Sequence, residues 1–294
     1  MHSKTENDAF TKIETQIPFS LGLHSSIGCG GYAKAGFYPK TEDELVWLIE
    51  YLVGLGERYV VVGNMTNVLP SDEFLDKTVV CTKKCTEVRF TIDGAYVSAG
   101  LSAGRFLAAC EQNEKTGAEF LDGIPCTLGG ALYMNAGVSG KYIAEIVQYV
   151  RVLYRGKIIE LSLADCQYAY KTSVFMQKEY VILGARLRLD KASVGEIQQK
   201  RALYMQRRLH LPKAKSMGCV FKNPSGLIAG KLIEGAGLKG LRIGGAKVSQ
   251  EHANFIINDN HATANDIKKL IDVIKKAVRS QYGVELQEEI RYLY

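Results

Sequence analysis

The amino-acid sequence predicts an α+β protein with two regions. It has 294 residues, about twice the length of an average domain. Helical and strand patterns follow one another without a regular βαβ alternation, and several strands are joined by tight turns, which favours antiparallel pairing in places. With 47% hydrophobic and 23% charged residues, the composition is typical of a folded globular protein. The first region is predicted to end near residue 190.

The first region contains a well-marked helix followed by a strand. Thr41 and Glu44 form a capping box, and apolar residues with helical spacing continue to Val53. The run Tyr59–Val62 is continuous and β-branched, which predicts a buried strand. Further predicted elements are strands at 78–82, 87–92, 95–98, 147–154, 157–161 and 180–189, a helix at 103–115, and hairpin turns at 93–94 and 155–156.

The second region is predicted to hold three helices and a short strand pair. Ser193 and Glu196 form a capping box that begins a basic helix, which continues to about residue 209. A second helix is predicted at 227–235, and a strand pair within 241–258. A third helix begins after its cap at Thr263 and ends at Gly283, with one apolar face. Apolar residues then alternate through 284–292 and predict a terminal strand.

Charge, apolar runs and cysteine content exclude several classes of protein. The net charge of +6 is spread along the chain, which argues against a nucleic-acid partner. No apolar run approaches the roughly 18 residues of a membrane span, and the polar N-terminus contains no signal-peptide core. The seven scattered cysteines predict reduced thiols, a cytoplasmic location and no metal site. Cys81 and Cys85 are interpreted as buried strand residues.

Two glycine-rich loops are candidate ligand sites. Gly63-Asn64-Met65-Thr66-Asn67 follows the strand at 59–62, and residues 123–130 read GIPCTLGG. Successive backbone amides in such loops form concavities that bind anions such as a pyrophosphate, and glycine lets the backbone approach a flat ligand closely. Neither loop matches the Rossmann or P-loop fingerprint. Tight structural turns are the alternative interpretation.

Three stretches of sequence resemble one enzyme family. They are GAEFLDGIPCTLGGALYMNAG from Gly117, SMGCVFKNPSGLIAGKLIEGAGLKGLRIGGAKVSQEHANFIIN from Ser216, and EEIR from Glu288. They resemble the UDP-N-acetylenolpyruvoylglucosamine reductases of the shorter type. The similarity runs from about Ser25 to Arg291, which is nearly the whole chain.

This resemblance implies an architecture and an activity. A two-lobed FAD-binding domain of the vanillyl-alcohol-oxidase kind would cover residues 1–190, with lobes of about 1–75 and 76–190. A smaller substrate-binding domain would cover residues 191–294, with a C-terminal strand that returns to the active site. The implied activity is reduction of UDP-N-acetylglucosamine enolpyruvate to UDP-N-acetylmuramate for peptidoglycan, with NADPH as the reductant. A cytoplasmic monomer is expected, with this nucleotide and NADPH as its small-molecule partners.

By the same resemblance, Cys219, Glu289 and Lys171 fall on catalytic positions. Hydride addition to the enolpyruvyl ether develops charge on the neighbouring carbon, which then needs a proton and stabilising groups. Cys219 stands where relatives carry a serine proton donor, and a thiol, with a reference pKa of about 8.5, gives up its proton more readily than a hydroxyl. Each residue also has a structural interpretation. Cys219 would be a buried, inert cysteine, Glu289 would form a solvated ion pair with Arg291, and Lys171 would be a surface lysine.

Two departures from the family pattern bear on function. Relatives carry arginine where this chain has Lys171, and lysine lacks the planar, two-pronged grip of a guanidinium. Relatives carry glycine where this chain has Met65, so this residue must keep a negative φ or accept strain. These departures favour, as alternatives, a diverged flavin oxidoreductase with another substrate or a catalytically silent nucleotide-binding homologue.

The resemblance also assigns ligand contacts. The FAD contacts lie on the glycine-rich loops and the segments that follow them: Val62, Gly63, Asn64, Met65, Thr66, Asn67, Gly123, Ile124, Pro125, Thr127, Gly129, Gly130, Asn135, Ala136, Gly137 and Ile182. The substrate contacts are Tyr170, Lys222 and Asn223. The basic helix, with Lys200, Arg201, Arg207 and Arg208, either attracts the nucleotide diphosphate or carries solvated charges. His252 is expected to have a positioning or core role.

Overall fold

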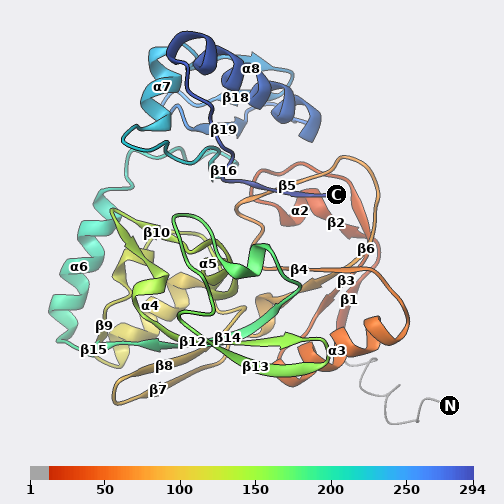
Figure 1. Ribbon diagram of the computed structural model, residues 1–294, viewed down its shortest axis with the longest axis vertical. Coiled ribbons are helices and arrows are strands. Elements are labelled where there is room, and N and C mark those ends of the chain that lie inside the picture. The colour runs from red at the N-terminus through yellow and green to blue at the C-terminus, as the bar shows by residue number, and fades with distance from the viewer. Residues whose placement is uncertain (1–12) are drawn as a thin grey trace. The chain divides into compact units, whose positions relative to one another are not determined.

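The computed structural model describes residues 13–294, which divide into two compact units (Figure 1). Unit 1 consists of the segment that ends at Ile17, Ala35–Asn64 and Lys77–Arg208. Unit 2 consists of Pro18–Lys34, Met65–Asp76 and Leu209–Tyr294. Two short N-terminal segments therefore pack with the C-terminal part of the chain. The functional domain limits expected from the sequence stay a prediction.

Unit 1 is built on two sheets. One is antiparallel with the order β13-β12-β14-β8-β7, and the other has the order β1-β3-β6-β4, with β4 and β6 parallel. Their strands are β1 (Glu14–Gln16), β3 (Tyr32–Tyr38), β4 (Tyr59–Val62), β6 (Leu75–Cys81), β7 (Val88–Thr91), β8 (Gly94–Ser98), β12 (Val147–Tyr154), β13 (Lys157–Ser162) and β14 (Val181–Arg188). The short pairs are β9 (Lys115–Thr116) with β15 (Asp190–Lys191), and β10 (Gly137–Val138) with β11 (Lys141–Tyr142).

Helices cover these sheets and form two hydrophobic cores in unit 1. The helices are α3 (Glu42–Gly54), α4 (Ala103–Gln112), α5 (Leu128–Met134) and α6 (Val194–Gln206), and the 3₁₀ turns are Thr82–Lys84, Glu119–Leu121, Ile143–Glu145 and Val174–Met176. The predicted caps at Thr41 and Ser193 are present, each accepting a backbone N–H three residues on. The apolar face of α3 packs against strand residues such as Phe37 and Val80, while α4 and α5 pack into the core of the antiparallel sheet.

Three local predictions in unit 1 need correction. Strand β4 has the predicted bounds, but it lies at the end of its sheet and only Val62 is buried, because it has a strand partner on one side only. The helix predicted to reach Lys115 ends at Gln112, and Lys115 pairs in β9. Ile92, predicted at the end of a strand, lies in the hairpin turn and is 96% exposed.

Unit 2 combines a four-stranded antiparallel sheet with two helices. The sheet order is β16-β19-β18-β17, and α8 packs on β17, β18 and α7 (Figure 1). The elements are β2 (Phe19–Ser20), α2 (Leu21–His24), β5 (Val68–Pro70), β16 (Ser216–Cys219), α7 (Ala229–Gly235), β17 (Arg242–Ile243), β18 (Ala246–Val248), β19 (Phe255–Asn258), α8 (Ala264–Tyr282) and β20 (Arg291–Leu293).

Helix α8 matches its prediction, and a distant carboxylate adds to its cap. Thr263 and Asp266 form the expected capping box, and Gly283 ends the helix with φ of 67°. Asp72 also accepts hydrogen bonds from the backbone N–H groups of Ala264 and Asn265, at 2.9 and 3.1 Å. A carboxylate at a helix N-terminus satisfies donors that have no partner within the helix and complements the helix dipole. These bonds fix the segment around Asp72 to α8.

The chain end forms less strand than its alternating pattern predicts. Only Arg291–Leu293 is a strand, parallel to β5, while Glu288 makes an isolated bridge with Phe221. The alternation of burial nevertheless holds at Leu286 and Ile290, which are buried. The segment predicted as one strand therefore pairs with two partners: Glu288 pairs with Phe221, and Arg291–Leu293 pairs with β5.

The cysteines are reduced thiols, as predicted. All seven are free, and Cys219 is the one that is partly exposed, while the other six are buried. Across residues 13–294, no group of three or more His, Cys, Asp or Glu side chains is placed to hold a metal ion. No helix in this described part is both long and apolar enough to cross a membrane.

Candidate functional site

The two glycine-rich loops meet within unit 1. A Cβ atom on Gly63 would lie 2.2 Å from Oγ1 of Thr127, so only glycine allows this approach. The Asn64 side chain donates a hydrogen bond to the Pro125 carbonyl at 3.1 Å. Gly63, Gly129 and Gly130 stay half-buried, so backbone is accessible beside the contact. Residues 63–64 and 123–130 are called the paired loops below.

Backbone geometry and charge make the paired loops suitable for an anionic, flat group. Thr127 caps α5 by accepting the N–H of Gly130, and Gly123 has φ of 74°. Burial raises the pKa of the Cys126 thiol to about 12, and the positive charges of Arg208 and Lys171 oppose that rise. Both cations therefore lie near this loop. Half-buried glycine backbone together with nearby positive charge fits the pyrophosphate and ring system of FAD.

Lys171 lies at the tip of a tight turn. Ala169 and Thr172 exchange backbone hydrogen bonds at 3.1 Å across the turn, and Lys171 has φ of 54°. The Asn135 side chain donates to the Ala169 carbonyl at 2.9 Å and accepts the N–H of Ala144 at 3.3 Å. Asn135, predicted as a FAD contact, is itself buried and supports this turn.

The other predicted contacts of unit 1 differ in exposure. Tyr170 is 43% exposed and packs edge-to-face on Tyr142. Val62, Ala136 and Ile182 are buried, whereas Ile124 and Gly137 are half-buried and Pro125 is exposed. The sequence pattern did not predict which of these contacts are buried and which are exposed. Glycine and apolar residues occur in both settings, so residue type alone does not distinguish them.

Met65 adopts the strained, positive-φ backbone conformation, which was one of the two alternatives expected from the sequence. Its φ is 50°, in the left-handed region, and its side chain is 4% exposed. Its carbonyl accepts the N–H of Ser26 at 3.4 Å within unit 2. The chain thus keeps the backbone geometry of a glycine at this position while burying a methionine side chain. Thr66, next to it, is half-buried.

Cys219 and Glu289 lie on neighbouring backbone segments within unit 2. The N–H of Glu289 donates to the carbonyl of Val220 at 2.8 Å, and the N–H of Lys222 donates to the carbonyl of Gln287 at 2.8 Å. These bonds pair the segment that follows Cys219 with the segment that contains Glu289. Both Cys219 and Glu289 are half-buried. A thiol and a carboxylate that were 70 positions apart in the sequence are therefore on neighbouring segments.

Asn67 holds the Glu289 segment from the other side. Its side-chain amide donates to the Glu289 carbonyl at 3.1 Å, and its own carbonyl accepts the N–H of Arg291 at 2.9 Å. Asn67 was predicted only as a FAD contact, and sequence reasoning missed this second role. An asparagine in a glycine-rich loop gives no indication of which distant backbone group it will bind.

The substrate positions carried over from the family lie just after Cys219. The Asn223 side-chain oxygen accepts the N–H of Ala229 at 3.0 Å, at the start of α7. Lys222 is half-buried and Asn223 exposed. His252 packs against the rings of His210 and Phe255, and burial holds the pKa of His252 below its usual range, with the neighbouring His210 as the next cause. His252 is half-buried, and its expected positioning or core role stays a prediction.

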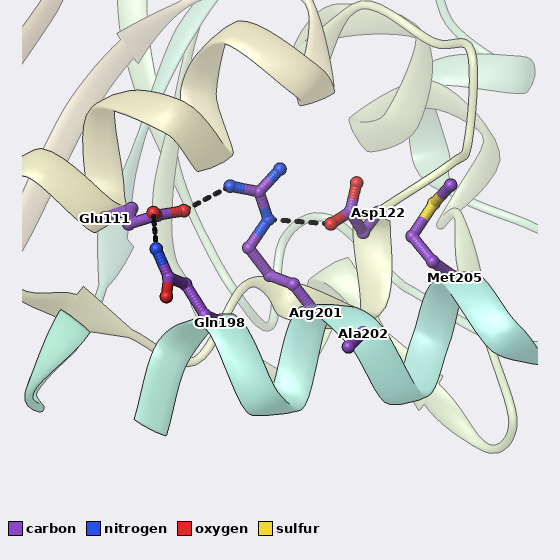
Figure 2. A pocket seen from close by; sticks show the side chains of 6 residues that line it. All are labelled: Glu111, Asp122, Gln198, Arg201, Ala202 and Met205. Atoms are coloured by element: carbon purple, nitrogen blue, oxygen red, sulfur yellow. Dashed lines mark hydrogen bonds and ion pairs between the residues drawn. The ribbon is translucent and has the colours of Figure 1, made fainter. Parts of the chain in front are cut away.

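Much of the charge on the basic helix α6 is used structurally. Figure 2 shows Arg201 reaching from α6 to Asp122 and Glu111, which its guanidinium contacts at 2.7 and 2.5 Å. Lys200 donates to the Thr116 hydroxyl at 2.9 Å, and Arg207 lies over the Tyr204 ring. The surface pocket at Arg201 therefore contains paired charges. Arg208 lies against Gly123 of the paired loops.

Comparisons with known proteins identify two matching families. The FAD binding domain matches residues 33–162, and the C-terminal domain of UDP-N-acetylenolpyruvoylglucosamine reductase matches residues 210–293. The α+β class, with a FAD-binding domain followed by a smaller C-terminal domain, is thereby confirmed.

Similar proteins cover nearly the whole chain. The UDP-N-acetylenolpyruvoylglucosamine reductase of Caldanaerobacter subterraneus is 39% identical over 274 residues, which are 91% of this chain and 90% of that protein. The reductase of Thermotoga maritima is 38% identical over 276 residues, covering 92% and 95%. The crystal structure of the reductase from Thermus caldophilus has a TM-score of 0.81 at 30% identity, covering 96% of this chain and 99% of that one.

Proposed function

This chain belongs to the UDP-N-acetylenolpyruvoylglucosamine reductase family, and on this premise we propose that Cys219, Glu289 and Lys171 carry the proton and charge chemistry of the reaction. The activity is the NADPH-dependent, FAD-dependent reduction of UDP-N-acetylglucosamine enolpyruvate to UDP-N-acetylmuramate, a step in peptidoglycan precursor synthesis. The observation that carries the residue assignment is the 2.8 Å bond from the Glu289 N–H to the Val220 carbonyl, because it sets the thiol and the carboxylate on paired segments.

The paired loops are the residues that would hold FAD. Gly63 approaches Thr127 so closely that position 63 has no room for a side chain, and Lys171 and Arg208 place positive charge nearby. Transfer of a hydride from NADPH to the terminal carbon of the enolpyruvyl ether is the chemistry that FAD supplies when bound. The protein orients the reactants and stabilises the charge that develops on the neighbouring carbon and its carboxylate.

Cys219 is the proton donor in this proposal. It is the one partly exposed thiol, so it is accessible to a substrate, whereas the other six thiols are buried. A neutral thiol gives its proton to the carbon next to the site of hydride addition, and solvent later restores that proton. Glu289, on the paired segment, stabilises the charge distribution at this carbon or orients the group that donates the proton.

Lys171 provides electrostatic support for the developing carboxylate-enolate charge. As an ammonium it acts as a point charge and lacks the fork of a guanidinium. The turn that carries it is fixed by Asn135 and by the two bonds between Ala169 and Thr172, so the charge is held in place with little reorganisation. A lysine here therefore keeps the charge of the family's arginine and loses its bidentate geometry.

The remaining assignments complete the proposal. Tyr170, Lys222 and Asn223 contact the sugar nucleotide, and the glycine-rich loops with their neighbouring residues contact FAD, as the family resemblance implies. NADPH and the sugar nucleotide bind in turn, because both must reach the same redox centre. The protein acts as a cytoplasmic monomer.

The test separates the two half-reactions of the enzyme. NADPH-reduced protein is mixed anaerobically with the enolpyruvyl nucleotide while flavin absorbance is followed, and flavin reduction by NADPH is measured separately. Cys219→Ser should keep measurable turnover, since a hydroxyl can donate the proton more slowly. Cys219→Ala should nearly abolish the enol-ether step and leave flavin reduction unchanged.

A matched control comes from another thiol of unit 2. Cys29 is buried, so Cys29→Ala removes a thiol without removing an accessible proton donor, and both half-reactions should keep their rates. Equal loss of both half-reactions in Cys219→Ala would contradict the assigned role, and so would an unchanged enol-ether step.

A further inference from the structure

Asn254 is a buried amide beside the segment that contains Cys219. It is 3% exposed and directly precedes β19. Neither composition nor the family-derived assignments give it a role. Its surroundings are unusual because every polar group of its side chain is directed to the backbone of one other residue, Phe221.

The Asn254 side chain hydrogen-bonds to both backbone polar groups of Phe221, as the main chain of a neighbouring β-strand does. Its side-chain oxygen accepts the N–H of Phe221 at 2.9 Å, and its side-chain NH₂ donates to the carbonyl of Phe221 at 2.8 Å. The Asn254 main-chain carbonyl also accepts the N–H of Val220 at 2.8 Å. Three hydrogen bonds from one residue therefore hold the two residues that follow Cys219.

The backbone groups of Phe221 need a side-chain partner because the main chain that precedes β19 turns away from them. The ladder between β16 and β19 ends at the pair Cys219 and Phe255. Before Phe255 the backbone forms a turn, in which the N–H of Phe255 donates to the His252 carbonyl at 3.0 Å. The next backbone groups on the Cys219 side would lose their strand partner at this point. The amide of Asn254 takes the partner's place for one further residue.

The opposite edge of the same segment is held by the chain end. The N–H of Glu289 donates to the Val220 carbonyl, and the N–H of Lys222 donates to the Gln287 carbonyl, both at 2.8 Å. The backbone after Cys219 is therefore fixed on both edges, on one of them by a single residue, Asn254. Buried backbone groups without partners are costly, so this arrangement strongly restrains the segment.

We propose that Asn254 is a positioning residue that fixes the Cys219 thiol for proton transfer. The inference rests on the proposed role of Cys219 as proton donor. Proton transfer requires the donor within hydrogen-bond reach of the accepting carbon in a defined direction, and a misplacement of about 1 Å costs roughly 10²-fold in rate. Release of one edge of the segment displaces the thiol, while flavin reduction by NADPH does not use the thiol.

Asn254→Asp tests this proposal because pH decides whether the new side chain can make both hydrogen bonds to Phe221. A protonated carboxyl reproduces the amide, because its O–H donates to the Phe221 carbonyl and its other oxygen accepts the Phe221 N–H. An ionised carboxylate has no donor and repels that carbonyl. Burial raises the pKa of such a carboxyl, so the protonated form persists to higher pH than in an exposed aspartate, and the ionised form prevails above that pKa.

The measurement is the rate of the enol-ether step relative to wild type as a function of pH. For Asn254→Asp this ratio should lie near one at low pH and fall by roughly 10²-fold at high pH, with flavin reduction unchanged throughout. In the FAD-free protein, alkylation of Cys219 by iodoacetamide should be faster than in wild type at high pH only. A ratio that does not change with pH overturns the proposal.

Asn258→Asp is the matched control. Asn258 lies on β19 of the same unit and also holds backbone, donating to the carbonyls of Ile27 and Gly28 at 2.9 and 3.3 Å. Its substitution should lower stability without a selective, pH-dependent loss of the enol-ether step. The same pH-dependent loss in both variants would indicate general loosening of unit 2 and overturn the proposal.

Two further variants keep the test decisive. If Asn254→Asp does not fold, Asn254→Ser retains one of the two side-chain bonds and should slow the enol-ether step but not flavin reduction; equal slowing of both overturns the proposal. Combining Asn254→Asp with Cys219→Ala should lose no more activity than Cys219→Ala alone, and an additional loss overturns it. A selective effect of Cys219→Ala with none for Asn254→Asp refutes only the positioning role, whereas no selective effect of Cys219→Ala refutes the donor assignment itself.

Discussion

Met65 combines a strained backbone with a buried side chain, and the two contributions can be separated. Its φ of 50° lies in the left-handed region, which costs an ordinary residue about 1–2 kcal/mol. Its side chain is 4% exposed, and burial of a methionine contributes about 1.5–3 kcal/mol of stability. A single substitution changes both terms, so a pair of substitutions is needed.

Met65→Ala and Met65→Gly form that pair. Both remove the buried side chain, at a cost of about 2–5 kcal/mol each. They differ in the backbone: glycine adopts positive φ without a clash, which favours Met65→Gly by about 1–2 kcal/mol, whereas the greater freedom of glycine in the unfolded chain favours Met65→Ala by about 0.5–1 kcal/mol. Met65→Gly should therefore be the more stable of the two, by up to about 1.5 kcal/mol.

The assay is urea unfolding of FAD-free protein, so that ligand binding does not contribute to stability. Met217 provides the control, because it is buried in β16 of the same unit and is not among the described residues with positive φ. There the order should reverse, with Met217→Gly less stable than Met217→Ala by about 1 kcal/mol. If glycine is the less stable choice at both positions, Met65 carries no backbone strain and the reasoning is refuted.

Three further predictions concern charge. Arg201→Met leaves the buried Asp122 without its guanidinium and should lower the free energy of unfolding by about 1–3 kcal/mol in denaturant titration, so an unchanged midpoint contradicts the role of this pair. Because burial holds the pKa of His252 below its usual range, the unfolded chain takes up the proton first as the pH falls, and wild type should lose stability below about pH 6.5. His252→Gln should reduce this loss of stability. If the unfolding midpoints of both proteins change equally with pH, His252 does not contribute to the loss. Lys171→Met should slow the enol-ether step by roughly 10²-fold in rapid mixing while Lys171→Arg retains it, and a Lys171→Met variant as fast as wild type would show that the charge is not used.

Elements whose signals are local were predictable from the sequence. Helix α8 is the clearest case, since its cap at Thr263, its apolar face and the glycine at 283 all act within one or two helical turns. The hairpin of β12 and β13 was equally clear, with Arg155 and Gly156 at φ of 49° and 72° as a two-residue turn requires. Burial was less predictable: β4 has the composition of a central strand, yet it lies at the end of its sheet.

The candidate site was predictable only as a set of residue types at family positions. Cys219 and Glu289 were identified by their motifs, but the pairing of their segments depends on backbone bonds between parts of the chain that are far apart in sequence. Asn67 shows the limit well, because its loop position predicted a FAD contact and its side chain also binds the Glu289 carbonyl. Asn254 carried no recognisable signal, since the reason for an amide there is a strand that turns away.

The sequence by itself determined helices such as α3 and α8, the hairpin of β12 and β13, the reduced thiols and the family to which the chain belongs, because capping, periodicity and motif spacing are properties of neighbouring residues. Only the tertiary structure decided which glycine-rich loops meet, that Met65 adopts positive φ, and that two asparagine side chains hold the segments of the proposed proton donor and carboxylate. The physical reason is that a buried backbone N–H or carbonyl must find a partner wherever the fold places it, and that partner is chosen by position in space.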